Sequence, residues 1–119
     1  MKVCAPVVVA VLAAVALAPH ARADSFEGTW QAVAPAQSIQ CPGVNAHFTV
    51  KGDGFGSRIG VAKYTFGFRG KINPDGSFDT KSPGGTAHIA GKFSGNNLTF
   101  QFEDNQCPSS RTLTGQRTG

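Results

Sequence analysis

Hydrophobic and polar residues alternate with a period of two along most of the chain after residue 25. The clearest case is the segment 63–72, KYTFGFRGKI, where one set of alternate positions holds Tyr64, Phe66, Phe68 and Ile72. The other set is mostly basic or polar. Because successive side chains of a β-strand point to opposite faces, this pattern predicts a strand with one buried and one solvated face.

The same alternation predicts further short strands, and no segment after residue 25 has the spacing of an amphipathic helix. Their inward faces are marked by Phe26, Gly28, Trp30 and Ala32; Phe48 and Val50; Phe55, Ile59 and Val61; Phe78; Ala87, Ile89, Gly91 and Phe93; Leu98, Phe100 and Phe102; and Leu113. Turn sequences separate these runs at 51–54, 73–76, 82–85 and 94–97, where glycine, asparagine and proline suit tight hairpins. About eight short strands joined mostly by hairpins predict an all-β barrel or sandwich.

The first 23 residues have the three parts of an export signal. Lys2 supplies a positive charge, residues 3–18 are apolar, and Ala21-Arg22-Ala23 has the small-x-small pattern that signal peptidase cleaves. The apolar run is shorter than the ~20 residues that span a bilayer, and Pro6 interrupts it. We predict a cleaved signal peptide at 1–23 and one exported domain at 24–119, periplasmic or extracellular, with no membrane span in the mature chain.

Cleavage changes the charge and the cysteine count. Removing Lys2 and Arg22 leaves nine basic residues against 7 acidic ones, so the net charge falls from +4 to +2. This is too weak a charge to indicate a nucleic-acid partner, which is expected to need a strongly basic stripe. Two cysteines remain, Cys41 and Cys107, and an even number in a small exported domain predicts a disulfide rather than a metal site.

The stretch Gly28-x-Trp30 at the start of an all-β chain resembles the first strand of calycin-type barrels, the lipocalin and avidin relatives. The resemblance implies an antiparallel up-and-down barrel in which Trp30 closes one end and Arg117, in the last strand, packs across it. A glycine two residues before Trp30 on the same face is expected to leave room for a neighbouring aromatic. The alternative is a single aromatic in the core of an ordinary sandwich.

The whole mature chain resembles a set of short exported bacterial proteins of uncharacterised function. The shared pattern is a Gly-x-Trp start, two cysteines, glycine-punctuated hairpins and a last strand ending in arginine, matched here by Gly28, Trp30, Cys41, Gly70, Gly76, Gly91, Cys107 and Arg117. Leu113 departs from it, because such proteins often have tryptophan there. The resemblance implies no known activity. In an up-and-down barrel, the loop after the first strand and the loop before the last lie at the same end, where Cys41 and Cys107 would meet.

The chain offers little for catalysis. His47 and His88 are both predicted to point outward from different strands, and neither a Ser-His-Asp order nor a GxSxG elbow is present. Nine phenylalanines predict a barrel filled by side chains instead of one that encloses a ligand. We therefore expect a binding protein, not an enzyme, with no catalytic residue, metal or cofactor.

Two surfaces are candidates for binding, and the first is a basic wall. It is formed by basic residues predicted to project outward from adjacent strands: Arg58, Lys63, Arg69 and Lys71. Such a wall suits an anionic polymer or an acidic protein. The alternative is an ordinary solvated face with acidic neighbours in Asp53, Asp75 and Asp79.

The second candidate is the long loop 35–45, PAQSIQCPGVN, which is held at Cys41. Long loops on rigid scaffolds often carry binding residues, here Ser38, Ile39, Gln40, Gly43, Val44 and Asn45. This loop favours a second hypothesis, an inhibitor of a secreted hydrolase such as a protease or a lysozyme. In outline the chain resembles bacterial inhibitors of secreted metalloproteases, which act through an extended N-terminal tail. Only Asp24 and Ser25 precede the first strand here, so that mode is not expected.

Overall fold

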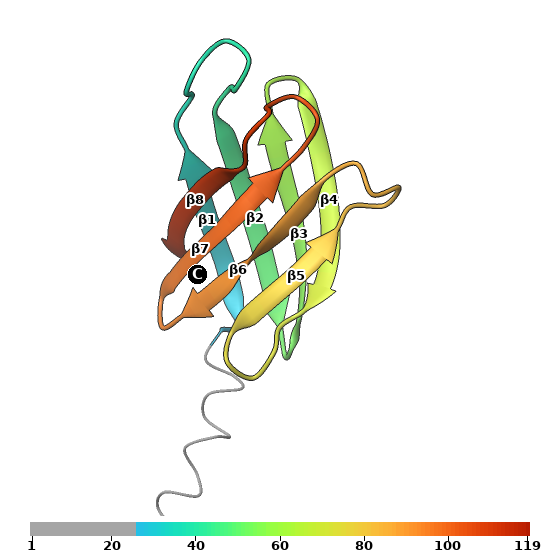
Figure 1. The fold of residues 1–119 in the computed structure, drawn as a ribbon. Coiled ribbons are helices and arrows are strands. Elements are labelled where there is room, and N and C mark those ends of the chain that lie inside the picture. Colours follow the sequence, from blue (N-terminus) through green and yellow to red (C-terminus); the bar gives the residue numbers. More distant parts are fainter. Residues whose placement is uncertain (1–25) are drawn as a thin grey trace, which may run out of the picture.

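The computed structural model describes residues 26–119, in which eight antiparallel strands form a nearly closed barrel (Figure 1). The strands are β1 (Gly28–Ala34), β2 (Val44–Lys51), β3 (Gly54–Val61), β4 (Tyr64–Lys71), β5 (Ser77–Lys81), β6 (His88–Ser94), β7 (Asn97–Glu103) and β8 (Arg111–Arg117). The prediction of an all-β, up-and-down barrel is confirmed. The predicted signal peptide at 1–23 lies outside the described residues.

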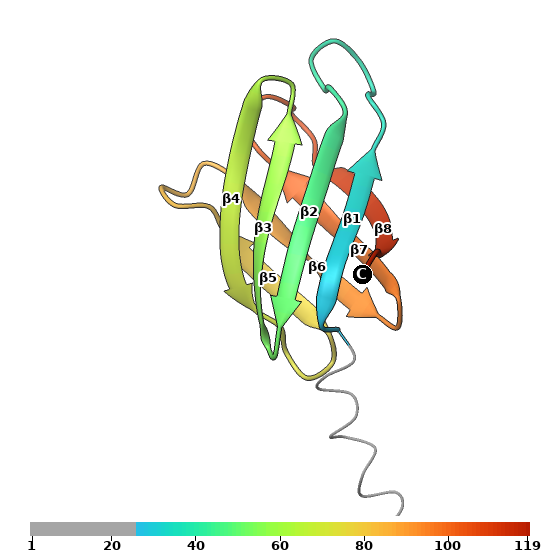
Figure 2. The same ribbon diagram turned by 180° about the vertical axis from the view of Figure 1, so that it is seen from behind.

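The strands follow one another around the barrel in the order β4-β3-β2-β1-β8-β7-β6-β5. The first and last strands, β1 and β8, pair with each other, with Ala32 opposite Gly115. The hydrogen-bonded ladder is interrupted once, between β4 and β5, which stand at its two ends. Figure 2 shows this seam beside β4, the outermost strand of the front sheet in that view.

Aromatic side chains fill the middle of the barrel, as the phenylalanine content predicts. Trp30 is completely buried, and eight of the nine phenylalanines are buried with it. Phe48 is central, since its ring centroid lies 5.2 Å from that of Phe100 and 5.8 Å from those of Phe78 and Phe93. Because an eight-strand barrel has room for little more than its own side chains, the loops and the outer wall are the surfaces open to a partner.

Trp30 and Arg117 meet at the end of the barrel where β1 begins. The guanidinium carbon of Arg117 lies 4.7 Å from the centre of the Trp30 ring, within the range of a cation–π contact. Arg117 also donates hydrogen bonds to the carbonyl of Glu27 and to Oδ1 of Asn96. The indole N–H of Trp30 donates to the carbonyl of Phe26 at 2.9 Å, so its one polar atom is satisfied inside the core.

The space beside Gly28 holds Gly119 and not a neighbouring aromatic, so the predicted reason for this glycine is wrong. Gly28 has a φ of 131°, and a Cβ there would overlap the carbonyl oxygen of Gly119 and contact the side chain of Arg117. Thr29 donates its N–H to that same carbonyl at 3.0 Å. Glycine is therefore required by backbone angle and by close backbone approach.

Three expectations for the segment 63–72 are also corrected. Tyr64, predicted to point into the core, is 51% exposed, because it is the first residue of β4 and extends past the packed interior. Phe66 is only partly buried, with its ring 5.6 Å from that of Phe102. Lys63 belongs to the turn before β4 and not to the strand. Alternation identifies the face of a residue but not the level at which the barrel ends.

Candidate functional site

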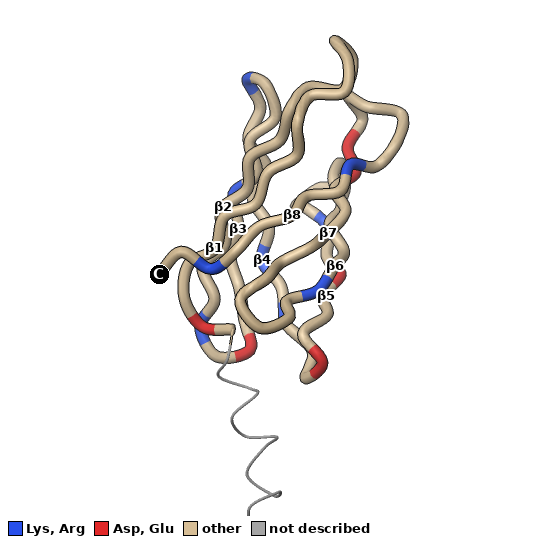
Figure 3. Tube along the Cα trace, turned by 90° about the vertical axis from the view of Figure 1, so that its left-hand side faces the viewer, with Lys and Arg blue, Asp and Glu red and all other residues tan. Residues whose placement is uncertain are grey.

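The basic wall lies on the outer face of β3 and β4. The antiparallel register places Arg58 opposite Gly67 and Arg69 opposite Gly56, and Lys71 follows Arg69 on the same face. All three basic side chains are exposed. Figure 3 shows basic positions along β4, with acidic ones in the turns at the end of the barrel where β1 begins. The structure thus brings together three of the four predicted residues, whereas Lys63 lies in the β3–β4 turn at the other end.

Acidic neighbours do not neutralise this face. Asp79 lies 2.6 Å from a ring nitrogen of His88, and Asp75 accepts a hydrogen bond of 2.7 Å from Ser77 Oγ. Asp53 lies in the β2–β3 turn. Within residues 26–119, no ion pair joins a carboxylate to the wall. The wall therefore presents uncompensated positive charge to the solvent.

Glycines form the floor between the basic side chains. A Cβ atom added to Gly56 or Gly67 would meet nothing within 4 Å, so both glycines face open space on the outer wall. The hollow above them has the main chain as its base, and the side chains around it are His47, Thr49, Arg58, Arg69, Lys81 and Pro83. Lys81 and Pro83 stand on the far side of the seam. A ligand can therefore reach the backbone of β3 and β4 with cations on either side.

The long loop between β1 and β2 extends beyond the barrel (Figure 1), and it ends before Val44, earlier than the predicted bounds 35–45. Ser38, Ile39 and Gln40 are exposed, and Ile39 is 100% exposed. Val44, which we predicted to be a binding residue, is 3% exposed and begins β2. Asn45 lies on the outer wall opposite Val33. The predicted loop extends two residues too far toward the C-terminus, because the strand alternation of β2 already begins at Val44, immediately after Gly43.

Two exposed hydrophobic side chains lie at the same end of the barrel. Ile39 from the β1–β2 loop and Tyr64 from the start of β4 border one hollow, together with Pro42 and the partly buried Phe66. Exposed apolar groups gathered from separate loops are typical of a surface that contacts another protein. The sequence places Ile39 in a loop but does not show that Tyr64 stands beside it.

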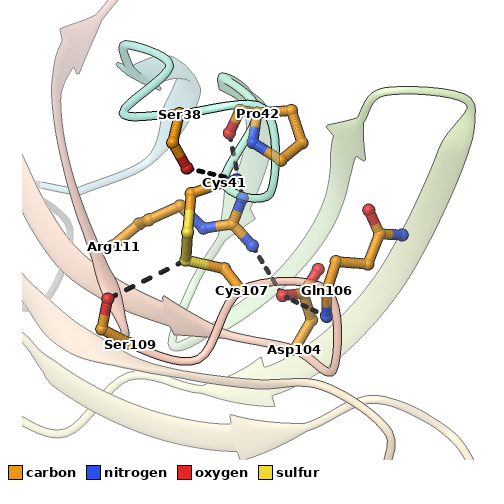
Figure 4. The surroundings of a disulfide bond; sticks show 8 residues. All are labelled: Ser38, Cys41, Pro42, Asp104, Gln106, Cys107, Ser109 and Arg111. Atoms are coloured by element: carbon orange, nitrogen blue, oxygen red, sulfur yellow. Dashed lines mark hydrogen bonds and ion pairs between the residues drawn. A yellow bond between two sulfur atoms is a disulfide. The ribbon is translucent and has the colours of Figure 1, made fainter.

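The predicted bridge between Cys41 and Cys107 is confirmed. Their Cα atoms lie 4.8 Å apart, and both residues are buried. The bridge joins the β1–β2 loop to the β7–β8 loop, and the Cys41 amide also donates to Ser38 Oγ at 3.2 Å (Figure 4). The disulfide therefore ties the β1–β2 loop to the barrel only two residues after its exposed tip at Ile39.

A buried ion pair beside the disulfide is absent from the sequence predictions. Arg111 Nη2 lies 2.6 Å from Asp104 Oδ1, and neither side chain is exposed. Arg111 Nη1 also donates to the carbonyl of Pro42 at 3.0 Å, next to Cys41 (Figure 4). Alternation with Leu113 places Arg111 on the inward face of β8, but the partner lies in a loop that the pattern does not position.

His88 joins three strands on the other side of the barrel. One ring nitrogen lies 2.6 Å from Asp79 Oδ1 on β5 and the other lies 3.3 Å from Glu103 Oε1 on β7. The hydrogen bond to Asp79 raises the pKa of His88 above its ordinary value of 6.5, and Glu103 adds to this effect against partial desolvation. The sequence places His88 outward but does not show the two carboxylates beside it.

This cluster predicts a pH-dependent increment of stability. Because the folded pKa of His88 is raised, the increment is complete below the ordinary pKa of 6.5 and is lost as the pH rises through the folded value. Thermal unfolding between about pH 5 and pH 9 should show His88→Gln losing stability relative to wild type at the acidic end only. His47→Gln is the control, because no carboxylate forms an ion pair with His47 within residues 26–119. A constant difference for His88→Gln at every pH would contradict the prediction.

Residues 26–119 hold no group of three histidine, cysteine or acidic side chains arranged to bind a metal ion. The same residues include no helix that is long and apolar enough to cross a membrane. Comparison of the chain with protein-family models, with curated proteins and with solved structures found no match.

Proposed function

We propose that the protein is an exported, non-enzymatic binding protein whose basic wall binds an anionic partner in the bacterial envelope or outside the cell. The observation that carries the proposal is the group of exposed cations at Arg58, Arg69 and Lys71, without an acidic partner, above a floor of glycine. The disulfide agrees with export, because such bonds persist in oxidising compartments.

Charge of one sign on one face attracts an anion in two ways. The summed field increases the rate of encounter, and each cation contributes attraction once the partner is bound. Exposed charges are screened over about 8 Å at physiological salt, so binding through this wall must weaken as salt is added. The exposed backbone at Gly56 and Gly67 removes the steric barrier that side chains at these positions would present.

Reversing the charge of the wall tests the proposal. The double variant Arg69→Glu with Lys71→Glu is expected to lose retention on immobilised heparin, used as a sulfated-polymer probe, at about 50 mM salt. Its thermal stability should stay within about 0.5 kcal/mol of wild type, because both side chains face water on a strand whose other face holds the core.

The matched control compares two single variants with equal changes in net charge. Arg69→Glu alters the wall, whereas Lys92→Glu alters an exposed position on β6. Arg69→Glu should weaken heparin retention more than Lys92→Glu does. Equal losses would show that only the net charge matters, and the wall would then not be a site.

The second candidate function is inhibition of a secreted protease or lysozyme through the disulfide-anchored loop. The observation that favours it is the fully exposed Ile39 beside Tyr64, at the end of the barrel. This function predicts the opposite pattern of sensitivity to substitution. Ile39→Asp should abolish inhibition in assays against secreted hydrolases. The Arg69→Glu, Lys71→Glu double variant should then inhibit like wild type.

A further inference from the structure

The seam leaves β4 with one free edge. β4 pairs with β3 along its whole length, from Tyr64 opposite Val61 to Lys71 opposite Gly54. On its other side the next strand is β5, which has 5 residues to the 8 of β4 and is not paired with it in the backbone ladder. Figure 2 shows the half of β4 nearest the β3–β4 turn without a strand on that side. A free edge presents unpaired backbone groups to any extended chain.

The register identifies these groups. The two-residue turn 62–63 makes Val61 and Tyr64 a hydrogen-bonded pair, and pairs alternate along an antiparallel ladder. Thr65, Gly67 and Arg69 therefore direct their N–H and C=O groups away from β3. A hydrogen bond from β5 supports this assignment, because Thr80 Oγ1 donates to the carbonyl of Arg69 at 3.1 Å. Within residues 26–119, Thr65 and Gly67 have no backbone partner on this edge.

The free edge of β4 is bordered by basic side chains on one side and by aromatic side chains on the other. On the outer side, the hollow over Gly67 is bordered by Arg69, Lys81 and Pro83. On the other side, a second hollow is bordered by the partly buried Phe66 together with Tyr64 and Thr86. Because side chains of a strand alternate between faces, a strand added here would place every second side chain near Phe66 and the others near the cations.

Charge selects the occupant. Within the described part of the chain, neither Arg69 nor Lys81 has a carboxylate partner, and Asp79, the acidic residue of β5, is held by His88. A second copy of this chain would bring its own cations to the same edge and be repelled. An acidic segment would be attracted, and its main chain would complete the hydrogen bonds of Thr65 and Gly67.

We propose that β4 accepts an extended peptide as a ninth strand, and that this peptide alternates apolar with acidic side chains. The inference rests on the proposed function and names the class of its anionic partner, a protein segment instead of a polysaccharide. Backbone hydrogen bonds along β4 would supply affinity, and Phe66 with Arg69 and Lys81 would supply selectivity, as in other cases of strand addition.

The first test changes the peptide. The probe is a peptide as long as β4, 8 residues, alternating valine and glutamate, and its binding is followed by fluorescence anisotropy. Two derivatives carry backbone N-methyl groups on one or the other set of alternate residues. One derivative should bind about tenfold more weakly than the parent and the other about equally, because only one set of amides faces β4. Equal binding of the two derivatives would overturn strand addition.

The second test changes the protein. Thr65→Pro removes a free N–H at the edge without removing a bond to β3, and Thr65→Ala keeps that N–H. The proline variant should bind the peptide about tenfold more weakly and the alanine variant about as wild type. Unchanged near-ultraviolet circular dichroism and an unchanged Trp30 emission spectrum verify that both variants fold. Equal peptide binding by the two variants would contradict the inference.

Heparin distinguishes failure of this inference from failure of the proposed function. Thr65→Pro should retain heparin binding, because the cations and the glycine floor of the wall are intact. Heparin binding without any binding of the peptide would overturn strand addition and leave a basic wall that binds polymers. If the Arg69→Glu, Lys71→Glu variant binds both probes as wild type does, the wall is not the site and both proposals are wrong.

Discussion

Replacing Asp104 with alanine is expected to lower the free energy of unfolding by about 3–5 kcal/mol, since it leaves a buried positive charge without its counter-charge. The side chains of Arg111 and Asp104 are both completely buried, and Nη2 of Arg111 lies 2.6 Å from Oδ1 of Asp104. The guanidinium also packs 5.2 Å from the centre of the Phe102 ring and holds the carbonyl of Pro42, so it is not free to turn toward water. Oδ2 of Asp104 and Nε of Arg111 have no hydrogen-bond partner, so little else compensates for the lost pair.

Urea unfolding followed by the fluorescence of Trp30, the only tryptophan, measures this change. The control is the double variant Asp104→Leu with Arg111→Met, which removes both charges and keeps apolar bulk. It should recover most of the lost stability, because an apolar pair can replace a buried ion pair at little cost. A loss below about 1 kcal/mol for Asp104→Ala would mean that Arg111 finds water or another acceptor, and the ion pair would then not hold this end of the barrel.

Removing the disulfide is expected to cost about 2–5 kcal/mol. The bridge closes a loop of 66 residues, and the chain-entropy account for a loop of this length gives about 4 kcal/mol. The closed loop runs from before β2 to just before β8, so the bridge restrains the segment that contains β2 to β7 when the protein is unfolded. Cys41→Ala with Cys107→Ala, unfolded in urea beside oxidised wild type, gives the measurement.

Ser109→Ala is the matched control, because Ser109 contacts Cys107 Sγ at 3.9 Å but leaves the bridge intact. This variant should unfold within about 0.5 kcal/mol of wild type. The two expected losses should not add when combined, since Arg111 binds the carbonyl next to Cys41 and both features hold the same loop. A Cys41→Ala, Cys107→Ala variant as stable as wild type would show that Arg111 alone keeps the loop in place.

Residue alternation was sufficient to predict the strands and most of their inward faces. Phe48, Phe100 and Leu113 are buried where the period of two places them, because the side-chain direction of a strand depends only on position along it. The disulfide followed from cysteine count and from the up-and-down order. The errors fall at strand ends: Val44 begins β2, and Tyr64 extends past the core. Local patterns carry no information about where a barrel stops.

The candidate sites divide in the same way. That Arg58, Arg69 and Lys71 face outward, and that Ile39 lies in a loop, follows from the sequence, because each depends on residues that are neighbours in the chain. Pairing with residues far along the chain was decided by the tertiary structure. Examples are Asp104 beside Arg111, two carboxylates around His88, and the carbonyl of Gly119 against Gly28. The free edge of β4 belongs to this second group. Alternation predicts that β4 is a strand. Only the arrangement of the whole barrel determines that β4 and β5 lie next to each other without forming a backbone ladder.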